Sequence, residues 1–122
     1  MPFTITLGFE TESDKNGFLE KVAPKVRGRQ IEADTPAEAD GLFRTAIVVT
    51  SQSAAKELCP LLVAFLVHVK SGRVQLTWPG AGGEPQVGEI NAGVGASREA
   101  DILAMRLGPA AKAFMDHEKA AS

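Results

Sequence analysis

A short loop at residues 91–97 carries the residue types that could bind a phosphate group, and it stands between an expected strand and an expected helix. Gly93 and Gly95 would let the backbone approach a ligand closely, and Ser97 lies where N–H groups at a helix start favour an anion. The dinucleotide-binding fingerprint also requires a third glycine within a parallel βαβ unit, and this loop lacks that glycine. We therefore favour a flexible connector and keep phosphate binding at Gly93, Gly95 and Ser97 as an alternative.

An acidic patch follows the first expected strand. Glu10, Glu12 and Asp14 could divide the roles of general acid and general base if one carboxylate were buried. Carboxylates at this place also belong to an ordinary solvated turn and to the charge that favours a helix start. We favour this second interpretation.

Cysteine and histidine offer little chemistry. Cys59 is the single cysteine, so an internal disulfide is excluded, and on an apolar helix it is expected to be a small buried hydrophobe. His68 and His117 stand far apart without cysteine partners, which makes a poor zinc ligand set. The sequence therefore predicts no catalytic residue, no metal and no cofactor.

The composition fits one soluble globular domain. The chain has 122 residues, a net charge of −2 and 44% hydrophobic residues. Lys and Arg are spread out, whereas a nucleic-acid binder shows a basic stripe. The apolar run at residues 58–69 is shorter than the roughly 20 residues that span a bilayer, and the first residues do not resemble a signal peptide. We expect a cytoplasmic protein that binds neither nucleic acid nor a membrane.

The first third of the chain predicts a strand, a short helix and an edge strand. Phe3, Ile5, Leu7 and Phe9 alternate with smaller or polar residues, as in a strand with one buried face. A helix over residues 14–26, capped by Ser13, is expected to follow, and Gly17 and Pro24 should make it short or broken. An edge-like strand is expected at residues 29–33.

The most informative stretch is a strand, a helix and a strand through residues 45–78. Residues 46–49 form the continuous β-branched run of a strand covered on both faces, and we expect this strand to be central. Ser51 or Ser53 would cap a helix over residues 54–70, which crosses over to a strand ending at Trp78.

The last third predicts a hairpin and a broken helix. Residues 86–91 would pair with the preceding strand, and a helix opening near Ser97 would break or kink at Gly108 and Pro109. Residues 118–122 are expected to fray. The prediction is thus one α/β domain over residues 1–122. It has a mixed sheet of four or five strands and two or three helices, in the order β-α-β-β-α-β-β-α.

The central helix is apolar on more than one side, which implies burial on more than one side. Its second side, opposite the sheet, would carry Cys59, Val63 and Val67. Trp78 either closes the core or anchors a partner. We predict that Cys59, Val63, Val67 and Trp78 form a partner-binding surface, covered by a second copy of the chain or by another protein.

The order of these elements resembles the effector-associated constant component domain of bacterial conflict systems. The matching segments are residues 45–49, 61–69, 73–77 and 86–90, which lie within a span of 46 of the 122 residues. At the end of the helix, His68, Lys70 and Arg73 stand where that family has an arginine cluster, and Pro60 is a further departure. The resemblance implies a non-enzymatic adaptor that couples a sensor to an effector.

The leading prediction is therefore a small bacterial protein-interaction or adaptor module, in which a homodimer is one possibility. A nucleotide- or phosphate-binding domain that uses the loop at Gly93 and Gly95 is the first alternative. An immunity protein that blocks a toxin by surface complementarity is the second.

Overall fold

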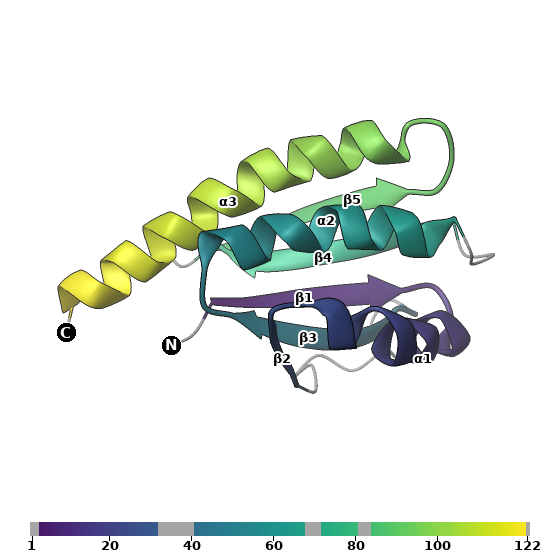
Figure 1. Ribbon diagram of the computed structural model, residues 1–122, viewed down its shortest axis with the longest axis horizontal. Helices are drawn as coiled ribbons and strands as arrows, with labels where there is room; N and C mark the ends of the chain where they lie inside the picture. Colours follow the sequence, from purple (N-terminus) through teal and green to yellow (C-terminus); the bar gives the residue numbers. More distant parts are fainter. Residues whose placement is uncertain (1–2, 32–40, 68–71, 81–83, 122) are drawn as a thin grey trace.

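The computed structural model describes residues 3–31, 41–67, 72–80 and 84–121, of which residues 118–121 are described by their backbone alone (Figure 1). Five strands form one sheet in the order β2-β3-β1-β4-β5, and every neighbouring pair is antiparallel. The elements in chain order are β1 (Phe3–Phe9), α1 (Glu12–Lys21), the 3₁₀ helix η1 (Ala23–Lys25), β2 (Gly28–Ile31), β3 (Phe43–Val49), α2 (Gln52–Leu66), β4 (Arg73–Pro79), β5 (Pro85–Asn91) and α3 (Ala96–Ala121).

Two interleaved crossovers explain this strand order. Because β3 and β4 are both antiparallel to β1, they run parallel to each other with β1 between them, and α2 connects them. In the same way α1 and η1 connect β1 to β2 across β3. This is the split βαβ arrangement of ferredoxin-like folds, to which β5 and α3 are added at one edge.

The predicted order of elements is confirmed, but two expectations about the sheet are wrong. The sheet was expected to be mixed, whereas all its neighbouring strands are antiparallel. The strand predicted at residues 45–51 was expected to be central, whereas β1 holds the middle position and β3 is next to the edge. Both differences arise because each helical crossover skips one strand and therefore does not join direct neighbours.

The helices all cover one face of the sheet (Figure 1). The alternating residues Phe3, Ile5, Leu7 and Phe9 of β1 point to this face and are buried, together with the register partners Ile47 and Leu76. The alternation read from the sequence thus marks the core side of the sheet correctly. No helix in the described part of the chain has the length and hydropathy of a membrane-spanning segment.

Helix boundaries follow from capping and proline. Thr11, rather than Ser13, caps α1, because its Oγ1 accepts a hydrogen bond of 3.1 Å from the Asp14 N–H. The helix ends at Lys21, and Pro24 lies within η1, so the expectation of a short or broken helix over residues 14–26 is confirmed. Ser51 caps α2 in the expected way, with 3.1 Å from its Oγ to the Ala54 N–H.

A break or a kink was expected at Gly108 and Pro109; the helix does not break there, and α3 is one helix of 26 residues. Both residues are accommodated by their positions. Gly108 is buried against α2, where an added Cβ would lie 2.8 Å from Cδ of Lys56. Pro109 is exposed, and so is Met105 four residues earlier, so that water can solvate the carbonyl that lacks a helical donor. The helix also continues through residues 118–121, which were expected to fray.

Candidate interaction surface

The second side of α2 is largely covered from within the chain. In Figure 1, α3 lies beside α2 and runs in the opposite direction, and the two helices make the most extensive contact between any two elements. Cys59, which was expected on a partner-binding surface, is fully buried. Burial, and to a smaller degree the charge of Asp101, raises the pKa of the Cys59 thiol to about 12. Cys59 is therefore a packed core residue and not a contact residue.

Trp78 is also part of the core and is only 2% exposed. The guanidinium of Arg106, on α3, lies over its ring, with 4.9 Å from Cζ to the ring centroid. The prediction that Trp78 anchors a partner is therefore wrong for this fold. The other interpretation, that Trp78 closes the core, is confirmed, and the cover comes from a helix that was expected to break or kink.

Part of the predicted surface does remain on the outside of α2. Val63 is partly buried, and Val67, the C-cap residue, is 74% exposed. Lys56 and Glu57 are the last exposed polar residues of α2. Within the described span after Glu57, every partly or fully exposed side chain of the helix is apolar. We call this set the α2 apolar face; its residues are Pro60, Leu61, Val63, Ala64 and Val67.

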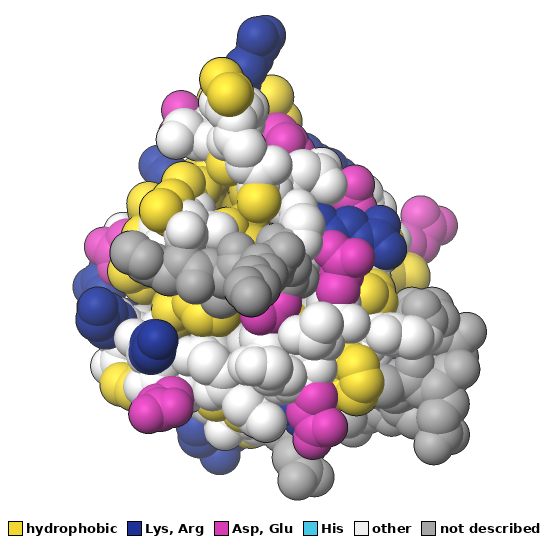
Figure 2. Space-filling view, turned by 90° about the vertical axis from the view of Figure 1, so that its right-hand side faces the viewer, with side chains coloured by type: hydrophobic (Ala, Val, Ile, Leu, Met, Phe, Trp, Pro, Cys, Tyr) yellow, Lys and Arg dark blue, Asp and Glu magenta, His cyan; other side chains and the backbone are white. Residues whose placement is uncertain are grey.

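The apolar surface extends toward the end of the molecule at which α2 ends and α3 begins. The connection between β5 and α3 reaches the same end (Figure 1), and its Val94 is fully exposed. Figure 2 shows this end, where hydrophobic side chains gather in the upper left part of the view. An apolar surface of this kind on a small protein is typical of a contact site.

Charged residues border the α2 apolar face. Arg27 donates two hydrogen bonds of 2.9 Å to Glu57, so the charge of Glu57 is matched by a residue just before β2. The stem of Lys56 lies against Gly108 of α3, and Asp101 of α3 is exposed. The arrangement is an apolar strip with a polar rim, as in many protein–protein contacts.

No family model, curated protein or solved structure matches this chain. The similarity to the effector-associated constant component domain therefore stays a prediction.

The geometry of the loop at residues 91–97 gives phosphate binding little support. Gly93 has a positive φ of 128°, and a Cβ there would meet nothing within 4 Å. The carboxylate of Glu99, in the first turn of α3, accepts hydrogen bonds from the backbone N–H and the side-chain Nδ2 of Asn91 at 3.3 and 3.0 Å. A negative charge thus already lies near Gly95 and Ser97 at the start of the helix, where an anionic ligand would compete with it. Since β5 is antiparallel to β4, the parallel unit of a dinucleotide site is also missing.

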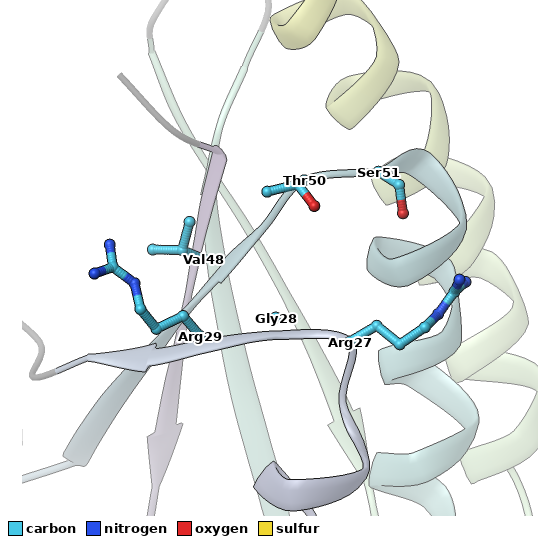
Figure 3. A pocket seen from close by; sticks show the side chains of 6 residues that line it. All are labelled: Arg27, Gly28, Arg29, Val48, Thr50 and Ser51. Atoms are coloured by element: carbon cyan, nitrogen blue, oxygen red, sulfur yellow. The ribbon is translucent and has the colours of Figure 1, made fainter.

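An open pocket of about 780 Å³ lies where β2 begins, β3 ends and α2 starts (Figure 3). Arg27 and Arg29 flank Gly28 at this place, and an added Cβ on Gly28 would lie 2.5 Å from the Val48 carbonyl oxygen. The two arginines extend in opposite directions, and Arg27 is held by Glu57. They do not converge on one ligand. The sequence analysis missed this pocket, although the Arg–Gly–Arg triplet could have drawn attention to it.

The three carboxylates of the acidic patch lie in different surroundings. Glu10 accepts a hydrogen bond of 3.0 Å from the Gly72 N–H, which joins the end of β1 to the start of β4. Glu12 is exposed. Asp14 is buried at 8% exposure, and its Oδ2 has no hydrogen-bond partner. Of the two histidines, His117 is exposed on α3 and His68 lies outside the described residues.

Proposed function

We propose that this chain is a small protein-interaction module and that its α2 apolar face packs against the same face of a second copy. The observation that supports this proposal is that every exposed or partly exposed side chain of α2 from Pro60 to Val67 is apolar. In a protein that stays monomeric, polar side chains at such exposed positions would not lower the free energy of unfolding. Complete burial of one valine side chain stabilises an association by about 1.5–3 kcal/mol, so a few such side chains can hold two helices together.

A second copy fits this face in shape and charge. Ala64 is small and lies between Pro60 and Val67, so two helix backbones can approach closely at the centre of a two-fold contact. With the two α2 helices antiparallel, each Lys56 lies beside the carbonyl end of the other helix, where a cation is favoured. Glu57 is already paired with Arg27, so no uncompensated carboxylate is buried.

The test is the oligomeric state of wild type and Ala64→Glu, measured by sedimentation velocity between about 5 and 200 µM, the range in which weak dimers form. We expect a concentration-dependent wild-type dimer, and a folded Ala64→Glu monomer with unchanged circular dichroism. Ala113→Glu is the matched control, because Ala113 is an exposed alanine on the outside of α3. It should dimerise like wild type. A wild-type monomer over the whole range would contradict self-association.

The immunity-protein alternative needs an exposed contact surface as well, but it predicts a monomer that forms a heterodimer. The oligomeric state therefore separates these two possibilities. For the phosphate-binding alternative, the carboxylate of Glu99 beside Asn91 is an unfavourable observation.

A further inference from the structure

The outer edge of β5 carries a series of backbone groups that point away from the sheet. The Ala92 N–H donates to the Gly72 carbonyl at 2.8 Å, and the Gly80 N–H donates to the Glu84 carbonyl at 2.7 Å. These two pairs fix the alternation of the β4–β5 ladder, in which even-numbered residues of β5 bond to β4. The backbone N–H and C=O groups of Val87, Glu89 and Asn91 therefore face outward.

Two side chains of α3 reach this edge, one on each side of Glu89. Nη2 of Arg106 donates to the Val87 carbonyl at 3.3 Å. Oε2 of Glu99 accepts from the Asn91 N–H at 3.3 Å. A strand that tried to pair with β5 would have to displace both contacts. Pro85, at the start of β5, has no N–H to offer.

Both side chains are held in place by the close approach of α3 to β5. An added Cβ on Gly88 would lie 2.3 Å from Cδ2 of Leu103 and 3.2 Å from Cη2 of Trp78, so only glycine lets the helix lie this near. The guanidinium of Arg106 rests on the Trp78 ring. Arg106 is itself exposed, and its position over the strand edge is supported by this contact with a buried residue.

We infer that Arg106 and Glu99 keep β5 from pairing, and that the edge beneath them is a latent site for β5 of a second copy. An antiparallel pairing with Gly88 of both copies on the two-fold axis places Val87 opposite Glu89 of the other copy. This register avoids facing two Glu89 carboxylates, which would be unfavourable. It lies on a different surface from the α2 apolar face and does not depend on the proposed function.

The test removes both contacts in the Ala64→Glu background, so that association through α2 does not interfere. Arg106→Met keeps a flexible stem over Trp78 but has no donor for the Val87 carbonyl, and Glu99→Ala removes the acceptor. We expect this triple variant to sediment as a dimer where Ala64→Glu alone is a monomer. Hydrogen exchange in residues 85–91 should slow at least about tenfold as the edge becomes paired.

Two further variants make the outcome decisive. The control is Lys112→Ala with Asp116→Ala in the Ala64→Glu background. It also removes one positive and one negative charge from α3, but these two residues form their own ion pair of 3.8 Å and not a contact with β5. This control should stay monomeric. Val87→Pro added to the triple variant should restore the monomer, because the lost N–H is an outward one. A folded triple variant that remains monomeric overturns the inference. If the triple variant does not fold, Arg106→Met alone in the Ala64→Glu background is tested in the same way, and a monomer with unchanged exchange at β5 overturns it equally.

Discussion

The guanidinium of Arg106 lies over the indole of Trp78, with its Cζ atom 4.9 Å from the ring centroid. This contact joins the middle of α3 to β4 across the edge strand β5. It explains why Trp78 is nearly buried although it stands one residue from the end of a strand. The sheet is closed at this place by a long cationic side chain instead of a hydrophobic one.

Replacing Arg106 should lower the free energy of unfolding through two losses, the contact with Trp78 and the hydrogen bond to the Val87 carbonyl. Arg106→Ala removes the contact with Trp78 and the hydrogen bond to Val87, and we expect the free energy of unfolding to fall by about 1–2 kcal/mol. Arg106→Met keeps cover over the ring and should lose less than half of that. Urea unfolding followed by Trp78 fluorescence measures both, and equal losses in the two variants would show that apolar cover over the ring contributes little.

Gly88 should be the glycine of β5 that tolerates no side chain. An added Cβ would collide with Leu103 of α3, and we expect Gly88→Ala to lower the free energy of unfolding by about 1–3 kcal/mol. Leu103→Ala lowers the free energy of unfolding by itself. In that background Gly88→Ala should lower it further by less than it does in wild type, because the clashing side chain is gone, and a double-mutant cycle measures this difference. As the control, Gly95→Ala should change little, because the nearest atom to its Cβ is 3.9 Å away. Additive losses at Gly88 and Leu103 would contradict a direct clash.

The sequence predicted the fold well and the exposed surface poorly, for one physical reason. Alternation in β1 and the apolar run of α2 are local patterns, and both elements lie where these patterns indicate. The cover over Cys59 and Trp78 is supplied by α3, which is far away in the sequence and was expected to break or kink at Gly108 and Pro109. Local propensity disfavours both residues in a helix, but packing of Gly108 against Lys56 and the exposed position of Pro109 outweigh it. Which face of α2 stays open therefore depends on a tertiary contact that periodicity does not reveal.

The thiol of Cys59 should be unreactive in the folded protein and should make stability depend on alkaline pH. Its pKa is raised from 9.0 to about 12 in the fold. Above pH 9 the unfolded chain loses this proton while the folded chain keeps it. The free energy of unfolding should therefore fall as pH rises from 9 toward 12, by up to about 1.4 kcal/mol per pH unit. Urea titrations at several pH values test this, and Cys59→Ala should flatten the dependence. Rapid alkylation of the native protein at pH 8 would contradict the burial of the thiol.

Phosphate ligands should not stabilise the protein through the loop at residues 91–97. The carboxylate of Glu99 bonds to Asn91 at the start of α3, and an anion would be repelled there. We expect no shift in the melting temperature of wild type with inorganic phosphate, ADP or ATP. A shift that is lost in Gly95→Val would instead support the phosphate-binding alternative, because that residue lies in the loop and not in the core.

Two neighbouring positions at the end of α2 should respond in opposite ways to the same substitution. Phe65 is buried in a cluster of rings, with its centroid 6.1 Å from that of Phe9 and 6.0 Å from that of Phe18. Phe65→Glu would place a charge in this cluster and remove a contact worth about 3–5 kcal/mol, so this variant should not fold. Val67→Glu changes an exposed side chain and should keep the circular dichroism and melting temperature of wild type within a few degrees.

The same pair of variants separates packing from association. If the α2 apolar face binds a second copy, Val67→Glu should raise the dissociation constant of the dimer at least about tenfold, a loss of about 1.4 kcal/mol, while the monomer stays folded. Val94→Glu, at the same end of the molecule but outside α2, tests how far the contact extends and should have a smaller effect. A Val67→Glu protein that dimerises as tightly as wild type would place the contact elsewhere, since a carboxylate cannot be buried there without a partner charge.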